Sequence, residues 1–311
     1  MNGISAEYHK QHAVKLLRLS RNNWIRILAR MNMAVLQSPS DPNKRLFLAV
    51  HMLKFLGRQQ VRCSEMARST RAFLAPERRA FLWLLGLWTV VNLAYIHIGR
   101  FDLVGDEAQY WDWSRRLALG YYSKPPLIAY IIAALTSACG HKEWVIRSGA
   151  VLFSSGTLLV LHALTLRIAA TADGGRIKPR AESTALLTAC VMLAMPASWV
   201  GSVLMTVDAP MVFFWVLAMY AFHRAVAGEQ GYWWLVGTAL GLGMLAKYTV
   251  FLLAISFALY LVIVDRRPLR TAGPYVALCL ILVLMSGVVY WNATNNWVSL
   301  RHTAAIGVGG F

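Results

Sequence analysis

Charge is scarce in this chain, and cysteine pairs are missing from it. Charged residues make up 14% of the 311 residues and hydrophobic ones 58%, whereas a soluble domain carries roughly a quarter charged residues. The four cysteines (Cys63, Cys139, Cys190 and Cys279) form no CxxC pair and no metal-ligand spacing, so we interpret them as small buried hydrophobes. This composition excludes an ordinary soluble domain and predicts an all-α, polytopic integral membrane protein. We expect no cofactor, and the sequence indicates no divalent metal.

Long apolar runs account for most of residues 80–311. A spanning helix needs roughly twenty apolar residues. We expect about seven spans, at residues 80–98, 148–169, 183–200, 211–227, 232–246, 249–264 and 274–291. A further run, 127–138, is too short to cross comfortably and follows Pro125-Pro126, so we expect a helix at the outer surface or dipping into it. Gly237, Gly241 and Gly243 lie inside an apolar run, which favours close packing of transmembrane helices over a phosphate loop.

Basic residues are concentrated ahead of the first apolar run. Residues 1–79 hold fifteen Lys and Arg against four Asp and Glu. A basic arm can bind nucleic acid, but basic flanks of membrane proteins stay cytoplasmic and contact anionic lipid. We therefore expect a basic cytoplasmic N-terminal extension over 1–79, a transmembrane domain over 80–311, membrane lipids as partners and no nucleic acid.

The connecting loops indicate an orientation. Loop 201–210 contains no Lys or Arg, whereas loop 265–273 contains three, so the first is expected outside and the second inside. The outer loop 99–147 breaks this rule. It contains Arg100, Arg115, Arg116, Lys124, Lys142 and Arg147. An anionic ligand would explain such an excess of positive charge.

Ionisable residues from separate parts of the chain are expected at the same outer boundary. They are Asp106, Glu107, Lys124, Asp208, Lys247, Arg301 and His302. Charges at a membrane boundary are functional by default, although pairing can be merely structural. Asp106 and Glu107 are neighbours, so on a helix they point roughly 100° apart and only one aims into a cleft. Asp208 has an alternative role as a helix cap or turn residue, and Lys247 as a lysine that snorkels to headgroups.

This inventory favours one kind of chemistry. A carboxylate can take a proton from a hydroxyl as a general base, and Lys or Arg can hold a phosphate. A leaving lipid phosphate is already a stable anion and needs cations rather than a strong acid. Transfer of a group from a lipid phosphate to a hydroxyl therefore fits. A transporter or flippase and an inactive membrane scaffold are the alternatives.

Several short motifs carry a family resemblance. They are Gly-Asp-Glu-Ala-Gln-Tyr-Trp (105–111), Tyr-Ser-Lys-Pro-Pro-Leu (122–127), Glu-Trp-Val-Ile-Arg (143–147), Met-Thr-Val-Asp-Ala-Pro-Met (205–211), Leu-Ala-Lys-Tyr (245–248) and the stretch 290–302. In their order and spacing the chain resembles the GT-C superfamily of polyprenyl-phosphate-sugar glycosyltransferases. It is most similar to bacterial members related to protein O-mannosyltransferases and lipid A aminoarabinose transferases.

The resemblance implies a site and a reaction. It makes Asp106 the catalytic base, followed by Glu107, with Asp208 as a second acidic residue and Lys124 at the lipid phosphate. It implies inverting transfer of a sugar from a polyprenyl-phosphate donor to a hydroxyl acceptor, at the periplasmic face of the cell inner membrane. Family chains run longer, so we expect the C-terminal part of the family to be missing here. We also expect further site residues: Lys247 and Arg301 at the donor phosphate, and Tyr110, Tyr122 and His302 at the substrate.

Overall fold

The described part of the chain is helical. A computed structural model describes residues 76–99, 102–172 and 179–307, and no strand occurs within those ranges. In chain order the elements are α3 (Pro76–Ile98), α4 (Gly105–Ser114), α5 (Leu127–Cys139), α6 (Glu143–Ala172), α7 (Pro179–Ala194), α8 (Pro196–Val203), α9 (Asp208–Val226), α10 (Tyr232–Ala246), η1 (Tyr248–Val250), α11 (Phe251–Ile263), η2 (Arg267–Arg270), α12 (Gly273–Thr294) and α13 (Val298–Gly307). The expected all-α class is confirmed. The expected extension 1–79 lies outside the described residues, apart from 76–79, which begin α3.

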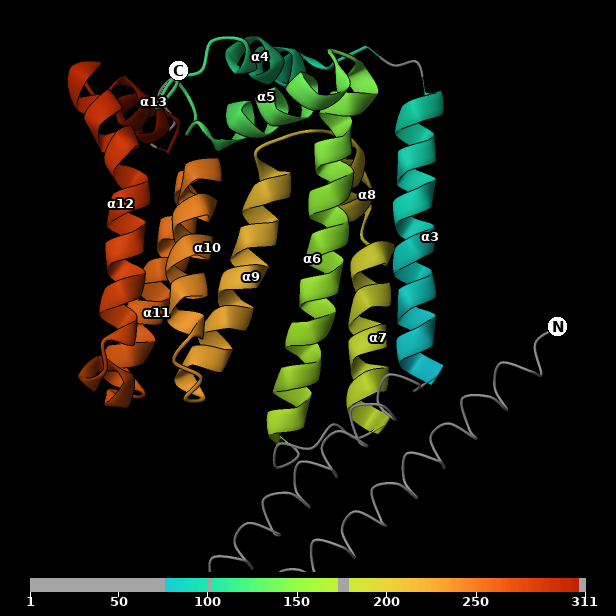
Figure 1. The fold of residues 1–311 in the computed structure, drawn as a ribbon, viewed down its shortest axis with the longest axis vertical. Helices are drawn as coiled ribbons and strands as arrows, with labels where there is room; N and C mark the ends of the chain where they lie inside the picture. The colour runs from blue at the N-terminus through green and yellow to red at the C-terminus, as the bar shows by residue number, and fades with distance from the viewer. Residues whose placement is uncertain (1–75, 100–101, 173–178, 308–311) are drawn as a thin grey trace, which may run out of the picture. The chain divides into compact units, whose positions relative to one another are not determined.

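The long helices run side by side as a bundle (Figure 1). Helices α3, α6, α9 and α12 are long and apolar enough to cross a membrane, and the bent pair α7–α8 adds a fifth span if it is counted as one. Helix α10 has 15 residues and α11 has 13, so both are shorter than these. All seven expected segments are therefore helical, but four or five of the described helices, rather than seven, meet the length and composition of a span. The protein is a multi-pass membrane protein.

A proline interrupts the span that was expected at 183–200. Helix α7 ends at Ala194, Met195 has an extended backbone (φ −79, ψ 126), and α8 begins at Pro196. Proline lacks the N–H that would continue the helix and moves its preceding residue out of the helical region. The axes of α7 and α8 consequently differ by 74°. The short α8 then leads through residues 204–207 into the start of α9.

Lys247 separates α10 from α11. Its backbone is extended (φ −154, ψ 129), so it ends α10 just before the short 3-10 turn η1. The chain reverses direction here, and α11 runs back along the bundle (Figure 1). This break falls between the expected spans 232–246 and 249–264, and it leaves the lysine at the end of the bundle, next to the start of α9.

Two glycines let α10 approach α12 closely. A Cβ atom added at Gly237 would lie 2.6 Å from the carbonyl oxygen of Ala277, and one at Gly241 would lie 2.5 Å from a methyl carbon of Leu284. Small residues at four-residue spacing permit such contacts between transmembrane helices. The packing role expected for these glycines is confirmed.

We expect Gly237→Ala to destabilise the protein. The new methyl group meets backbone atoms of Ala277, which cannot rotate away, and overpacking of this kind costs about 1–3 kcal/mol. Gly86 on α3 is a matched control, because a Cβ there meets nothing within 4 Å. Gly86→Ala should be neutral or stabilising by up to about 1 kcal/mol. Thermal unfolding of both variants in detergent measures the difference, and equal unfolding midpoints would contradict the close contact.

Three short helices lie across one end of the bundle. Figure 1 shows α4, α5 and α13 at the end that the start of α9 and the ends of α10 and α12 also reach. The segments that carry Asp106, Lys124, Asp208, Lys247 and Arg301 therefore meet at this end. We refer to it as the site end.

Candidate active site

Two neighbouring carboxylates of α4 have opposite environments. Asp106 is exposed and makes no ion pair within the described ranges, whereas Glu107 is 0% exposed. Adjacent helical residues point in different directions, so a single turn of helix can present one carboxylate to solvent and bury the other. Of the two, Asp106 is the one available to a substrate.

Glu107 connects three separate segments. Its carboxylate accepts hydrogen bonds from Nη2 of Arg147 on α6, at 2.7 Å, and from the backbone N–H of Met205 in the link between α8 and α9, at 2.9 Å. It also accepts a longer bond, 3.3 Å, from the N–H of Val104, just before α4. A buried carboxylate is tolerated only when it is paired and hydrogen-bonded. Glu107 therefore clamps α4 to α6 and to the segment that precedes Asp208.

Arg147 explains part of the positive charge in the outer loop 99–147. It is 4% exposed, and besides Glu107 its Nη2 contacts the carbonyl oxygen of Asp102 at 2.8 Å. Arg116 of the same loop pairs with Asp112 on the surface, at 3.2 Å. Carboxylates of the protein thus neutralise two of the six basic residues. The explanation by an anionic ligand does not extend to Arg147, since this buried guanidinium already has a partner.

Tyr110 is buried close to the exposed carboxylates of Asp106 and Asp208. Its ring is 2% exposed and packs in a cluster with Ile128, Met205 and other apolar residues of α5, α6 and the start of α9. Burial, followed by the negative charges of Asp106 and Asp208, raises the pKa of Tyr110 to about 12. Both carboxylates therefore act on one phenol, which stays protonated at neutral pH. Tyr110 was expected at the substrate, but in the structure it is a buried residue of the packing next to Asp106 and Asp208.

Asp208 and Lys247 form an ion pair at the site end. The Nζ atom of Lys247 donates to Oδ1 of Asp208 at 2.7 Å, and both side chains are partly exposed, 33% and 52%. Asp208 is the first residue of α9, where a negative charge is favourable to the helix dipole. Lys247 thus pairs with a carboxylate of the protein, rather than extending its ammonium group to the lipid headgroups. The pair joins the end of α10 to the start of α9.

The loop that carries Lys124 is packed on both sides. Tyr121 stacks on Trp113 of α4, with ring centroids 4.5 Å apart. On the other side, a Cβ at Gly120 would lie 2.7 Å from the indole of Trp291 on α12. Lys124 itself is half-buried and forms no ion pair with a described residue. Pro125 and Pro126 follow and restrict the backbone before α5 begins.

Helix α13 brings the remaining expected residues to the same end. The ring of His302 lies 4.7 Å from that of Tyr122, the neighbour of Tyr121 in the lysine loop. Ser299, which is 0% exposed, shares a hydrogen bond of 3.0 Å with the hydroxyl of Tyr248, next to Lys247. Arg301 is exposed. The expected residues thus fall into two groups, around Asp106 and around His302, and the Tyr248–Ser299 contact connects the two.

A cluster of metal ligands is not found at this end. In the segments that the structure describes, no three His, Cys, Asp or Glu side chains gather in a way that could hold a metal ion. The described groups are a free carboxylate, an ion pair and partly exposed cations. These groups can accept a proton and hold an anion.

Sequence reasoning missed the buried clamp. The motif Glu-Trp-Val-Ile-Arg was noted for its resemblance, but its arginine was assigned to an anionic ligand rather than to Glu107. One feature of the sequence could have predicted the pair. Arg147 lies at the start of a long apolar helix, where a buried arginine requires a carboxylate partner. The backbone N–H of Met205 left no such signal, since every residue of the link carries one.

Comparison with known proteins identifies the family to which the chain belongs. The family model described as dolichyl-phosphate-mannose-protein mannosyltransferase matches residues 123–291, more than half of the chain. The chain belongs to this family of GT-C glycosyltransferases, which confirms the resemblance seen in its motifs. The match contains Lys124, Asp208 and Lys247 and begins after α4, so Asp106 and Glu107 precede it.

One curated relative is similar over a longer stretch. It is the lipid A galacturonosyltransferase RgtD of Rhizobium johnstonii, which is 27% identical over 234 residues, or 74% of this chain. The alignment covers 46% of RgtD, so the chain spans about half the length of this relative. No solved structure matches the chain.

Proposed function

We propose that the protein transfers a sugar from a polyprenyl-phosphate donor to a hydroxyl acceptor, with inversion, and that Asp106 is the general base. The observation that carries this proposal is the exposed Asp106 carboxylate, which no described cation neutralises, at the same end as Lys124 and the Asp208–Lys247 pair. The family description names a polyprenyl-type phosphate sugar donor. The name of the relative RgtD supports a lipid acceptor, although a glycan or a protein would offer the same hydroxyl chemistry.

The reaction follows from these groups as a single displacement. Asp106 takes the proton of the acceptor hydroxyl, whose oxygen forms a bond to the anomeric carbon of the sugar. The bond between that carbon and the phosphate oxygen breaks on the opposite face, and the configuration inverts. The electron pair leaves with the polyprenyl phosphate, whose negative charge needs cations nearby.

Basic residues at the site end supply these cations. Lys124 is half-buried in a proline-restricted loop and has no ion pair in the described segments, so its ammonium group is available to the donor phosphate. Arg301 is exposed and can approach from α13. Because Asp208 already neutralises part of the charge of Lys247, this lysine would bind the phosphate more weakly than Lys124 or Arg301. Tyr122 and His302, whose rings lie together, provide an aromatic surface for the sugar.

The remaining acidic residues have supporting roles in this proposal. Asp208 holds Lys247 in place at the start of α9. Glu107 is buried and already accepts three sets of hydrogen bonds, so it positions Asp106 and takes no proton from the acceptor. This differs from the catalytic role that was expected for Glu107.

We further propose that the site end faces the periplasm and that the protein resides in the cell inner membrane. Residues 204–207, which reach this end, belong to a loop with no Lys or Arg, whereas η2 at the other end lies among three arginines. Positively charged loops remain cytoplasmic. Polyprenyl-phosphate sugars would enter from the lipid on the periplasmic side.

Transfer measured on membranes tests the donor site. We expect Lys124→Met to lower transfer from a radiolabelled polyprenyl-phosphate sugar by about ten- to a hundredfold, because a hydrogen bond to a charged group contributes about 1.5–3 kcal/mol. Lys142 is a matched control in the same outer segment, since it is exposed and precedes α6. Lys142→Met should keep near-full transfer. An unchanged Lys124→Met would remove this residue from the site, and no transfer by the unaltered protein to any hydroxyl acceptor would overturn the proposed function.

A further inference from the structure

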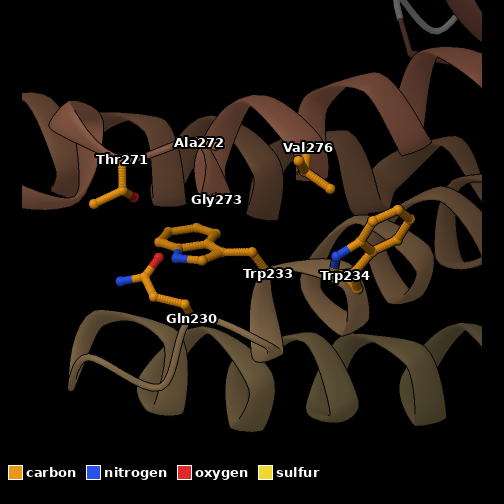
Figure 2. Close-up of a pocket in the computed structure, with 7 residues that line it drawn as sticks. All are labelled: Gln230, Trp233, Trp234, Thr271, Ala272, Gly273 and Val276. Atoms are coloured by element: carbon orange, nitrogen blue, oxygen red, sulfur yellow. The ribbon is translucent and has the colours of Figure 1, made fainter.

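A cavity lies at the end of the bundle opposite the site. It has a volume of about 410 Å³ and is formed where the start of α10 faces the start of α12 (Figure 2). Its walls are made by Gln230, Trp233, Trp234, Thr271, Ala272, Gly273 and Val276. This volume lies within the usual range for small-molecule sites, roughly 300–1,000 Å³, and is many times that of one water molecule.

One buried donor in this cavity has no acceptor. Trp233 is 2% exposed, and its indole Nε1 makes no hydrogen bond within the described structure. The ring lies against the backbone of Gly273, where an added Cβ would come within 2.0 Å of it, so the indole cannot be displaced toward α12. Figure 2 shows the indole between Gln230 and Thr271, on the lining of the cavity. A buried N–H without a partner is costly, and an acceptor on a bound molecule would satisfy it.

The segments around the cavity are positively charged. Residues 224–234 and 265–273 together hold four arginines and two acidic residues. Both acidic residues are already paired, Glu229 with Arg224 and Arg167, and Asp265 with Arg267. Arg270 directly precedes the cavity residue Thr271, is exposed and has no ion pair with a described residue.

An amphipathic anion fits these three features. The walls are mostly apolar, the single buried donor suits a carbonyl oxygen, and the exposed Arg270, next to the lining residue Thr271 in the chain, suits a phosphate. Trp234 is 61% exposed beside the cavity and Tyr275 is 58% exposed nearby on α12. Tyr and Trp gather where a membrane meets water. These two exposed aromatic residues therefore favour a position of the cavity near the membrane–water boundary, where the ester groups of a phospholipid lie.

We propose that this cavity binds one anionic phospholipid of the surrounding leaflet. An ester carbonyl of the lipid accepts the hydrogen bond of Trp233 Nε1, its phosphate pairs with Arg270, and its acyl chains follow the outer surface of α10 and α12. The site is separate from the sugar-transfer site and does not depend on the proposed function. Its occupant joins two helices whose close approach rests on Gly237 and Gly241.

Lipid binding to the full chain tests this proposal. The purified protein, freed of lipid in detergent, is titrated with phosphatidylglycerol or phosphatidylcholine and followed by native mass spectrometry. We expect one phosphatidylglycerol to bind about tenfold more tightly than phosphatidylcholine. Both lipids carry a phosphate, but the choline ammonium of phosphatidylcholine offsets that charge, whereas phosphatidylglycerol keeps a net negative charge for Arg270. Arg270→Gln should remove about that factor. Arg267→Gln is the matched control on the same turn, because Asp265 already neutralises Arg267, and it should change binding less than about twofold.

A second variant tests the buried donor. Trp233→Phe keeps an aromatic ring and removes the N–H, and it should weaken phosphatidylglycerol binding about two- to tenfold, as expected for a neutral hydrogen bond. Trp83→Phe, at an 81% exposed tryptophan of α3, is the control and should have no effect. Equal binding of the two lipids would indicate a cavity that holds only water or detergent and would overturn the proposal. Equal weakening by Arg267→Gln and Arg270→Gln would also overturn it, because it would indicate diffuse attraction to charge.

Discussion

Replacing Asp106 by asparagine is expected to lower sugar transfer by about 10²- to 10⁴-fold, the usual contribution of a positioned general base. The change keeps the shape of the side chain and removes its basicity. Asp106 is exposed and unpaired within the described ranges, so the variant should fold like the unaltered protein. Transfer rates on membranes at saturating donor, together with the thermal unfolding midpoint, separate a chemical effect from a structural one.

Asp112 provides the control on the same helix. It is a half-exposed carboxylate of α4, and it forms a surface ion pair with Arg116, whose side chain is 81% exposed. Such pairs contribute about 0–1 kcal/mol, so Asp112→Asn should retain near-full activity and stability. If Asp106→Asn also retained near-full transfer, Asp106 would not be the base.

The largest loss of stability is expected from Glu107→Gln. This change leaves the guanidinium of Arg147 buried without its counter-charge, and breaking a buried ion pair in this way costs about 3–5 kcal/mol. It also weakens the hydrogen bond that the backbone N–H of Met205 donates to residue 107, so the link before Asp208 is less firmly attached to α4. The thermal unfolding midpoint in detergent should fall clearly, and transfer should fall with it because Asp106 and Asp208 lose their common support.

Two further variants distinguish a clamp from a catalytic residue. Arg116→Gln breaks an exposed ion pair of the same loop and should change stability by less than about 1 kcal/mol. Replacing both Glu107 and Arg147 by methionine removes both buried charges together and should recover part of the lost stability. A Glu107→Gln protein with unchanged stability but lost transfer would contradict the clamp and return Glu107 to a chemical role.

Local sequence patterns predicted most of the helices but not how each would end. Apolar runs located every long helix, and Pro125-Pro126 located the start of α5, because these signals depend on a few adjacent residues. The bend at Pro196 was missed, since a proline near the end of an apolar run can lie in a kinked helix or start a new one. The bounds of α10 were predicted as 232–246, but its 15 apolar residues were counted as a span although they are fewer than the roughly twenty that a span needs.

The candidate site was predictable as a set of residue types rather than as a geometry. Helical spacing indicated that Asp106 and Glu107 would diverge, and the structure exposes the first and buries the second. Which of them would be buried depends on Arg147 and Met205, which lie 40 and 98 residues later in the chain. The pairing of Lys247 with Asp208 likewise depends on the folded positions of α9 and α10.

The partners of Glu107 also have a consequence for biosynthesis. When Glu107 is added to the growing chain, neither Arg147 nor Met205 has been made, and Met205 follows 98 residues later. At roughly 5–20 residues per second, that interval lasts about 5–20 s. Until Met205 has been made, the Glu107 carboxylate lacks one of the donors that satisfy it when buried, and this disfavours its burial. We therefore expect α4, with the proposed base Asp106, to dock fully only after the link between α8 and α9 has been made.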